Sequence, residues 1–413
     1  MSHYKAAGRF PEGGHNRPCG EIHLQSAAAM VLLSMLSEID PFYAMEINRL
    51  AHRMTGRTII HMEYGQPSTG APAAALEIAH QVLDSDAMGY WESRDLQEGL
   101  AAHYRRAYGL SVAPERFILT CGASPALVLA LTAFFAPGDT VALARPGYVA
   151  YRNVLKALHL TPVEIACGPE TRYQLAAAHL EAMATPPKGV IVASPANPTG
   201  TIIPDAELKA IAEVCRARGT TLISDEIYHG LCYTGPAATM LAYDPDAFVV
   251  GSFSKYFSMV AWRLGWLLAP EAKAERARAF CGNMFLTAPS LSQHAGVSAL
   301  TATDELERHV AMYRTNRDLL LKALPRLGLS RIAPPDGAFY LYVDVGHLTN
   351  DSLAFCKEVL EATGVAIAPG IDFDPVEGHR FIRLSFAVST AEVEEAITRL
   401  EPFFASRSGG APA

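Results

Sequence analysis

Lys255 ends a run, G-S-F-S-K, that follows a predicted strand over residues 248–251. Arg263 lies eight residues further along the chain. Two like charges close together disfavour the protonated amine, and a neutral amine is the nucleophile that forms a Schiff base with a carbonyl group. The pair therefore indicates Schiff-base chemistry, although an isolated S-x-x-K run is more often a surface lysine beside a structural arginine.

Two polar side chains follow other predicted strands. Asp225, in S-D-E-I-Y, comes directly after the strand 221–224. Its carboxylate could pair with a protonated ring nitrogen, but a lone aspartate here is more often a helix N-cap. Asn197, in S-P-A-N-P-T-G, follows the strand 190–194 and lies between two prolines, in a rigid turn that can present one amide. Taken alone, such a run is usually only a turn.

A fourth motif, T-C-G-A-S-P, closes the strand 117–120 and opens an apolar helix predicted over 125–135. Pro125 suits the first turn of that helix. Free backbone N–H groups and the helix dipole at this point form a seat for an anion. Many strand-to-helix turns share the pattern, so the motif is weak by itself.

The order of these motifs along the chain is that of a known family. From about residue 36 onward the chain resembles the class I/II pyridoxal-phosphate-dependent aminotransferases of the type I fold, in the aspartate aminotransferase superfamily. The matching motifs are S-P-A-N-P-T-G, S-D-E-I-Y, S-F-S-K and W-R-L-G-W, which together are very specific. The resemblance implies an α/β fold, with a large domain built on a mostly parallel sheet flanked by helices and a smaller α+β domain.

The resemblance also implies a role for each motif residue. Pyridoxal 5'-phosphate would be bound to Lys255 as a Schiff base, and Lys255 would then move a proton between the substrate Cα and the cofactor. Asp225 would pair with the pyridinium nitrogen, and Asn197 and Tyr228 would hydrogen-bond the 3′-oxygen. Tyr148, in R-P-G-Y, would stack on the ring; otherwise it is a core aromatic residue. The residues implied for the phosphate are Gly122, Ala123, Ser124, Ser252, Ser254 and Arg263, with Tyr90 reaching the neighbouring subunit's phosphate.

Arg383 is the candidate for substrate binding. In F-I-R-L-S-F, strand alternation places it on the face opposite Ile382 and Leu384, and an arginine in so apolar a run needs an anionic partner or water. The resemblance implies that it binds the substrate α-carboxylate, together with Asn197; the alternative is an interdomain ion pair. Gly65, in E-Y-G-Q-P, matches a loop bordering that carboxylate, where a missing side chain allows close approach.

The chain departs from the family in three places. The stretch around Tyr90 is shorter and lacks a glycine, with Trp91 as an uncommon neighbour, and Ala261 stands where a glycine is usual. No arginine occurs over 280–287, where aspartate-specific members place a second one. A side-chain carboxylate would then be unpaired, at a cost of several kcal/mol. We therefore expect a neutral, small or apolar amino-acid donor, although Arg94 could supply a charge from another direction.

These features predict an aminotransferase that passes the amino group to a 2-oxo acid such as 2-oxoglutarate or pyruvate. A carbon–sulfur β-lyase is the main alternative, because the same cofactor serves both reactions and pocket groups decide which bond is aligned for cleavage. A non-catalytic cofactor-binding sensor is the weakest alternative. The resemblance further implies a homodimer with shared active sites.

The elements that must position these residues alternate along the chain. Predicted strands at 117–120, 140–144, 163–166, 190–194, 221–224 and 248–251 alternate with helix-like stretches such as 205–218, as in a parallel sheet. A long helix over 305–327, strands over 339–345 and 381–386 and a helix over 391–404 follow. We expect a leader at 1–22, a large domain at 61–300, and a smaller domain formed by 23–60 and 301–413.

Composition narrows the class of protein. The 413 residues are 50% hydrophobic and 18% charged with a net charge of −8, so a basic footprint for nucleic acid is absent. Seven scattered cysteines, without a C-x-x-C pair, favour reduced thiols in a cytoplasmic protein. We predict no signal peptide, no membrane span and no metal site, because no apolar run is long enough to span a bilayer and the histidine spacing fits no ligand pattern.

Overall fold

The computed structural model of the protein describes residues 39–86 and 88–408. Its largest sheet has the strand order β2-β8-β7-β6-β5-β3-β4, and within the described chain β8 is the strand that runs antiparallel to its neighbours. The strands are β2 (Phe117–Thr120), β3 (Thr140–Arg145), β4 (Thr161–Ala166), β5 (Gly189–Ala193), β6 (Thr221–Asp225), β7 (Phe248–Ser252) and β8 (Gly265–Leu268). The predicted mostly parallel sheet is confirmed.

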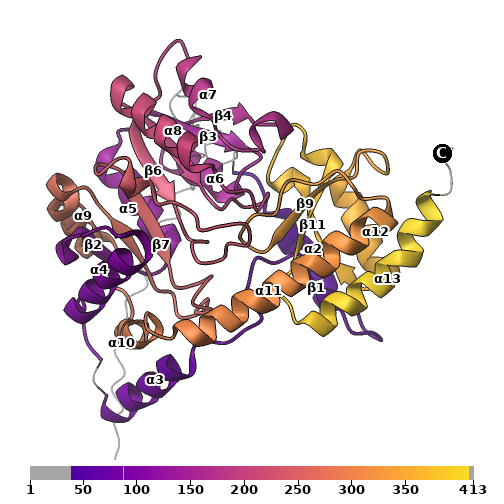
Figure 1. Ribbon diagram of the computed structural model, residues 1–413, viewed down its shortest axis with the longest axis horizontal. Helices are drawn as coiled ribbons and strands as arrows, with labels where there is room; N and C mark the ends of the chain where they lie inside the picture. The colour runs from indigo at the N-terminus through magenta and orange to yellow at the C-terminus, as the bar shows by residue number, and fades with distance from the viewer. Residues whose placement is uncertain (1–38, 87, 409–413) are drawn as a thin grey trace, which may run out of the picture. The chain divides into compact units, whose positions relative to one another are not determined.

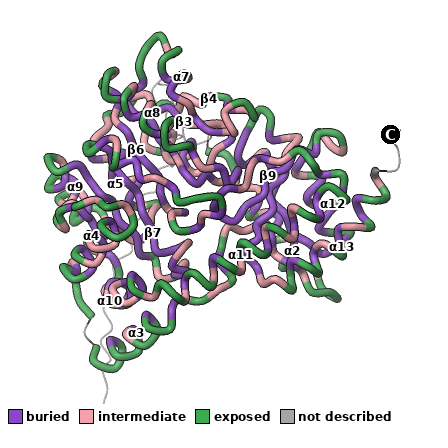
Figure 2. The backbone as a smooth tube through the Cα atoms, in the orientation of Figure 1, coloured by how far each residue is buried: buried purple, intermediate pink, exposed green. Residues whose placement is uncertain are grey.

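Helices cover both faces of this sheet because its central strands are apolar on both sides. Phe248 and Val250 of β7 pack in one cluster with α5 and α9, whereas Val249 between them packs in another with α4. Figures 1 and 2 show these helices around β7. The helices of this part of the chain are α3 (Ala73–Ser85), α4 (Arg94–Tyr108), α5 (Ala123–Phe134), α6 (Val149–Ala157), α7 (Ala177–Glu181), α8 (Asp205–Arg218), α9 (Glu271–Met284) and α10 (Ser290–Ala299).

A second core joins the beginning and the end of the described chain. Ile47 and Ile60 pack in one cluster with residues from Val310 to Phe404, and Tyr228 from the loop after β6 joins the same cluster. The elements around this core are α2 (Tyr43–Arg53), α11 (Thr303–Ala323), α12 (Ser352–Thr363), α13 (Thr390–Ser408), the antiparallel sheet of β9 (Tyr340–Asp344), β12 (Phe381–Ser385) and β11 (Ala368–Pro369), and the parallel pair β1 (Ile60–His61) and β10 (Val365–Ala366).

The domain boundaries at residues 60 and 300 stay predictions, and the leader predicted at 1–22 lies outside the described residues. No helix in the described ranges is long and apolar enough to cross a membrane; the cytoplasmic location stays a prediction. Most element ends agree with the sequence patterns to within two residues, but β8 was not predicted. Its first two residues, Gly265 and Trp266, belong to W-R-L-G-W, a motif whose arginine, and not its apolar residues, indicates a function.

Short 3-10 helices complete the chain. They are η1 (Pro114–Arg116), η2 (Pro169–Thr171), η3 (Met240–Ala242), η4 (Leu324–Leu327), η5 (Gly370–Asp372) and η6 (Gly378–Arg380). The first of them leads into β2, and η4 continues α11, so that the helix predicted over 305–327 is an α-helix followed by one tighter turn. Leucines at both ends of η4 are buried, which keeps this turn on the second core.

Candidate active site

A cavity of about 320 Å³ lies where β5, β6 and β7 end, as expected for a parallel sheet. It collects all the predicted site residues except Gly122 and Tyr90. Those that line it are Gly65, Ala123, Ser124, Tyr148, Asn197, Asp225, Tyr228, Ser252, Ser254, Lys255, Arg263 and Arg383. Residues separated by more than 300 positions therefore meet in one site.

Lys255 is a half-buried residue of the cavity wall, and two cations, Arg263 and Arg383, line the same cavity. Burial lowers the pKa of Lys255 to about 8, and the neighbouring Arg383 and Arg263 act in the same direction. Its Nζ donates a hydrogen bond of 2.5 Å to the carbonyl oxygen of Gly65. The sequence predicts that a neighbouring arginine lowers the pKa of Lys255, and Arg263 does so, but burial lowers it more. The result is a lysine that loses its proton easily, as a nucleophilic amine must.

Asp225 ends β6 with its carboxyl group fully enclosed. Burial raises the pKa of Asp225 to about 6, while hydrogen bonds from the Tyr151 hydroxyl to Oδ2 (2.6 Å) and from the backbone N–H of Ile227 to Oδ1 (3.2 Å) oppose that rise. Sequence reasoning missed Tyr151. It lies three residues after Tyr148 at the start of α6, and that spacing places both rings on one face of a helix.

The start of α5 has the geometry that the predicted anion seat requires, and anion binding there stays a prediction. Gly122 precedes the helix with φ +97°, and no side chain caps the first N–H groups. A Cβ atom on Gly122 would stand 2.3 Å from a terminal nitrogen of Arg263, so only glycine lets the guanidinium approach this turn. Arg263 also donates to the Ser254 hydroxyl at 3.4 Å. Gly122 therefore shapes the seat without lining the cavity.

Tyr228 and Tyr340 face the cavity as a hydrogen-bonded pair with 2.7 Å between their hydroxyl oxygens. Burial raises the pKa of Tyr228 well above its usual range, so the group stays protonated and can donate. Tyr340 was not predicted, because an aromatic residue in an apolar strand has no local mark of function. Its hydroxyl also explains Gly65, where an added Cβ would stand 1.8 Å from it.

Arg383 is 2% exposed and lies on β12 between two rings, with its guanidinium carbon 4.5 Å from the centroid of Tyr340 and 4.7 Å from that of Phe373. It donates to Oδ1 of Asn197 at 2.9 Å and to the carbonyl oxygen of Glu63 at 2.5 Å, while its Nε is buried without a partner. Among the described residues no carboxylate lies within ion-pair distance of it. The interdomain ion pair considered above is therefore wrong.

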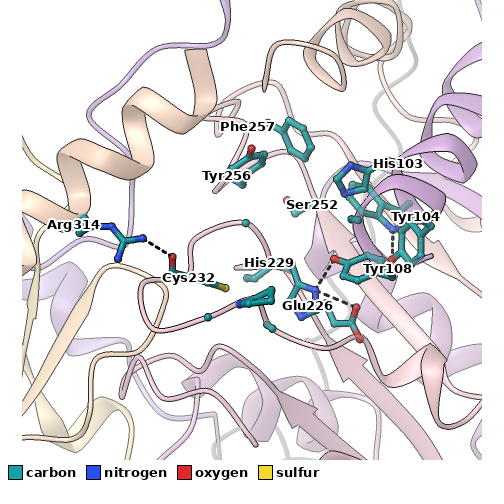
Figure 3. Close-up of a pocket in the computed structure, with 17 residues that line it drawn as sticks. His103, Tyr104, Tyr108, Glu226, His229, Cys232, Ser252, Tyr256, Phe257 and Arg314 are labelled. Atoms are coloured by element: carbon teal, nitrogen blue, oxygen red, sulfur yellow. Dashed lines mark hydrogen bonds and ion pairs between the residues drawn. The ribbon is translucent and has the colours of Figure 1, made fainter. Parts of the chain in front are cut away.

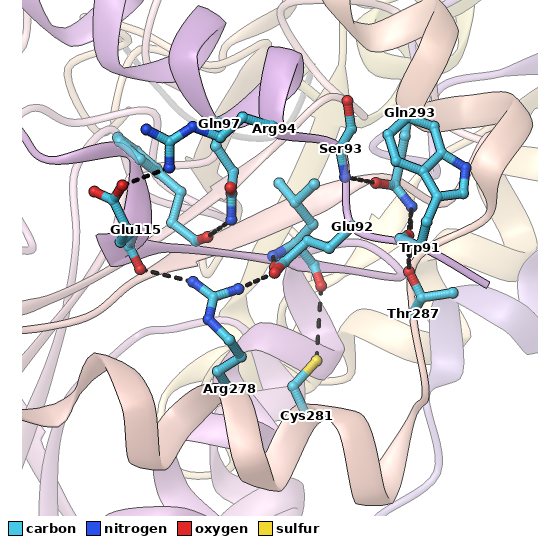
Figure 4. Close-up of polar contacts among 12 residues, drawn as sticks. Trp91, Glu92, Ser93, Arg94, Gln97, Glu115, Arg278, Cys281, Thr287 and Gln293 are labelled. Carbon is cyan, nitrogen blue, oxygen red and sulfur yellow. Dashed lines mark hydrogen bonds and ion pairs between the residues drawn. The ribbon is translucent and has the colours of Figure 1, made fainter.

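Tyr90 lies outside the cavity and is 86% exposed. The next residue, Trp91, is held by its carbonyl oxygen, which accepts from the Thr287 hydroxyl at 2.6 Å and from the Gln293 amide at 3.0 Å (Figure 4). Arg94 points elsewhere, to Glu98 and Glu115, so within one chain it gives the cavity no further charge. The lining cations are Lys255, Arg263 and Arg383.

The residues present fit pyridoxal phosphate. The helix start and Arg263 suit a phosphate, the buried Asp225 needs a cation such as a protonated ring nitrogen, and Lys255 provides the amine that reacts with an aldehyde. In the described part of the chain no group of three or more His, Cys, Asp or Glu side chains is arranged to hold a metal ion.

Comparisons with known proteins agree with this chemistry. Residues 57–400 match the family model for aminotransferase class I and II. The valine–pyruvate aminotransferase of Mycobacterium tuberculosis is 46% identical over 91% of this chain and 99% of its own length. An aspartate/prephenate aminotransferase of Thermus thermophilus is 33% identical over 86% of this chain and 94% of its own.

Solved structures show the same likeness. The crystal structure of an aminotransferase from Mycobacterium tuberculosis has a TM-score of 0.87 at 46% identity, covering 90% of this chain and 98% of that one. The Thermus thermophilus aspartate aminotransferase with maleate has a TM-score of 0.83 at 30% identity, covering 89% and 98%.

Proposed function

Because the chain belongs to the class I and II aminotransferases, enzymes that use pyridoxal phosphate to move an amino group from an amino acid to a 2-oxo acid, we propose that its donor is a neutral amino acid with a small or apolar side chain. Valine is the first candidate donor and pyruvate the first candidate acceptor, as the name of the 46% identical relative suggests, with 2-oxoglutarate as the other acceptor in the proposal. The observation that carries the proposal is Arg383, a buried cation in the cavity wall that has no acidic partner among the described residues.

The rest of the cavity wall supports an apolar donor. Phe42, Leu127, Val154 and Val260 line it alongside the polar residues. A second carboxylate on the substrate would need a second cation to pair with. Besides Arg383, the cations in the described lining are Lys255 and Arg263. In this proposal Lys255 binds the cofactor, and Arg263 lies at the predicted anion seat. An aliphatic side chain would instead bury apolar area against this wall.

Each residue at the site has a defined task in this proposal. When bound, pyridoxal phosphate supplies the electron sink that makes the substrate Cα–H acidic. The Nζ of Lys255 would be the group that accepts the proton from the substrate Cα and later gives it up. Asp225 keeps the ring nitrogen protonated, and Arg383 binds the substrate carboxylate through its planar fork. Asn197 and Tyr228 donate to the ring oxygen, and Tyr148 covers one face of the ring.

The proposal includes a homodimer that shares its active sites. Tyr90, Met88, Met284 and Leu286 are large apolar side chains that are exposed by 42% or more, and the segments around them are joined by the Thr287 and Gln293 bonds to Trp91 (Figure 4). Large exposed apolar side chains on segments linked in this way are typical of a subunit interface. Tyr90 would then reach the phosphate in the partner subunit's site.

The first experiment records the absorbance of the purified holoenzyme while single amino acids are added without any oxo acid. Transfer of the amino group to the cofactor removes the visible absorbance, and an oxo acid restores it. We expect valine and similar neutral amino acids to do this at much lower concentrations than aspartate. A stronger response to aspartate would overturn the proposed specificity, and a release of ammonia without recovery by an oxo acid would contradict transamination.

A further inference from the structure

A second cavity, of about 440 Å³, adjoins the active-site cavity. Ile227 and Ser252 line both of them. The wall of this rear cavity carries His229, Tyr108 and Glu226, which come from the end of α4 and from the chain that follows Asp225 (Figure 3). None of these three side chains lines the active-site cavity.

His229 is hydrogen-bonded at both ring nitrogens. Its Nε2 lies 2.9 Å from the carbonyl oxygen of Ser194, and its Nδ1 lies 2.7 Å from the Tyr108 hydroxyl (Figure 3). A carbonyl oxygen can only accept, so the ring proton is on Nε2 and Nδ1 accepts from Tyr108. Burial raises the pKa of Tyr108 well above its usual range, which keeps that donor protonated. The hydrogen bonds thus run in one direction, from Tyr108 through His229 to Ser194.

Ser194 is the point where this chain of bonds meets the active site. It directly follows β5 and begins the turn that carries Asn197. Its N–H donates to the carbonyl oxygen of Asp225 at 3.3 Å, and its hydroxyl accepts from the N–H of Ile203 at 3.0 Å. Ser194, whose carbonyl oxygen accepts from His229, is therefore also hydrogen-bonded to Asp225 at the end of β6. Its hydroxyl bonds Ile203, on the far side of the turn that carries Asn197.

Asn197 in turn has one orientation that its partners favour. Its Oδ1 accepts from Arg383 at 2.9 Å, so its amide N–H groups are directed away from the arginine and remain available to the cofactor. A tilt of the turn would break either this bond or the bond to the cofactor, because one amide has to serve both. A displacement of Ser194 would therefore weaken the bond of Asn197 to Arg383 or its bond to the cofactor.

We propose that His229 and Tyr108 are positioning residues for the transamination site, holding the turn of Asn197 from behind so that its amide contacts Arg383 and the ring oxygen of the cofactor together. The inference rests on the proposed role of Asn197 and extends it to two residues that touch neither substrate nor cofactor. Other titratable groups of this wall are Glu226, whose Oε2 lies 3.6 Å from Nδ1 of His229, and His103, Tyr104 and Cys232.

The test is a pH titration of the visible absorbance of the bound cofactor in the holoenzyme, with KM and kcat for the amino-acid donor. Loss of the Asn197 contact makes the ionised ring oxygen less stable, so His229→Phe should move the midpoint upward by about one pH unit and raise KM more than it lowers kcat. His229→Gln, whose amide can donate to Ser194, should restore most of the midpoint. Tyr108→Phe should give a smaller shift in the same direction.

His103→Phe is the matched control, because His103 lines the same cavity and no hydrogen bond joins it to any residue in the described ranges. It should leave the midpoint unchanged. Asn197→Ala separates the two hypotheses. If Asn197→Ala shifts the midpoint and His229→Phe does not, the positioning role is wrong while the role of Asn197 stands. If neither shifts it, the proposed role of Asn197 itself fails, and an equal shift with His103→Phe would also overturn the inference.

Discussion

The hydroxyl of Tyr151 donates a hydrogen bond of 2.6 Å to Oδ2 of Asp225, the carboxylate that faces the active-site cavity. This bond stabilises the ionised carboxylate, and it works against burial, which raises the pKa of Asp225 to about 6. The ionised form is the one that can pair with a protonated ring nitrogen. If Asp225 pairs with the cofactor as proposed, Tyr151 should strengthen cofactor binding near neutral pH.

We expect Tyr151→Phe to weaken cofactor binding about tenfold or more, since a hydrogen bond to a charged group contributes about 1.5–3 kcal/mol. The loss should grow as the pH falls toward the pKa of Asp225, because the variant carboxyl takes up its proton at higher pH. Dissociation constants measured by dialysis on both sides of neutrality would show this. Tyr243→Phe removes a tyrosine–aspartate bond outside the cavity, to Asp205, and the same weakening in that control would contradict the argument.

We expect the buried carboxylate of Asp225 to make the cofactor-free protein less stable at neutral pH, although the same carboxylate is proposed to bind the cofactor. Folding raises the pKa of Asp225 from 3.8 to about 6. The contribution of this carboxyl group to the free energy of unfolding is therefore fully present below pH 3.8 and is lost as the pH rises to about 6. About two pKa units at about 1.4 kcal/mol each give a penalty of about 3 kcal/mol at neutral pH. Asp225→Asn should therefore make the cofactor-free protein more stable to urea at neutral pH, while it binds the cofactor more weakly.

The same comparison at a pH below 3.8 should show no difference between Asp225→Asn and the natural protein, because both side chains are then neutral. Asp246→Asn is the control, since Asp246 is exposed and its replacement should change stability little at either pH. A gain of stability that persisted unchanged into acid would mean that the asparagine stabilises the fold by some means other than removal of a buried charge.

The sequence located those site residues that belong to motifs at strand ends. Asp225, Asn197 and Lys255 each follow a parallel strand, and parallel strands end at one edge of a sheet, so local patterns were enough to bring them together. The start of α5 could be placed for the same reason, because a glycine and free N–H groups mark it along the chain.

Other site residues could not be found this way. Tyr340 lies in an apolar strand of the second core, β9, and its contact with Gly65 depends on how β9 packs against the chain that follows β1. The sequence predicts a role for Gly65, and the structure places it in the cavity wall. The Tyr340 hydroxyl is the group that leaves no space for a Cβ atom there, and no local sequence pattern contains that contact. Arg94 is a residue whose charge made it a candidate for binding a substrate carboxylate. In the structure it pairs with Glu98 and Glu115 instead.

Arg383→Lys should lower kcat/KM for a neutral amino acid by a factor of about one hundred, because a lysine cannot form the two parallel bonds of the guanidinium fork and a bond of this kind contributes about 1.5–3 kcal/mol. Cofactor affinity should change little, since Arg383 is assigned to the substrate. Steady-state kinetics with valine and with the amine that lacks its carboxyl group would test this. The natural enzyme should prefer valine strongly, and the variant should have lost most of that preference.

Arg380→Lys is the matched control for Arg383→Lys. Arg380 lies three residues earlier and pairs with Asp344 away from the cavity, so its replacement should leave the preference for valine intact. If Arg383→Lys kept the full discrimination between valine and the amine, the substrate carboxylate would have to bind elsewhere in the site.

The proposed sharing of active sites between subunits predicts that two inactive variants restore each other. Lys255→Ala lacks the amine, and Tyr90→Ala lacks the side chain proposed to reach the partner's phosphate. A mixed dimer of the two has one site with neither change, because that site takes Lys255 from one subunit and Tyr90 from the other. Unfolding and refolding the mixture should restore roughly a quarter of the natural activity, since half of the dimers are mixed and each has one intact site.

Two controls decide how this result is understood. Lys255→Ala mixed with Asp225→Ala should recover nothing, because both residues line the same cavity of one chain and no mixed dimer has a site with both. If Tyr90 acted within its own chain, the Tyr90→Ala mixture would also recover nothing. A single-subunit mass in an active sample, measured by ultracentrifugation, would exclude the shared site altogether, and the exposed apolar residues around Tyr90 would then need another partner.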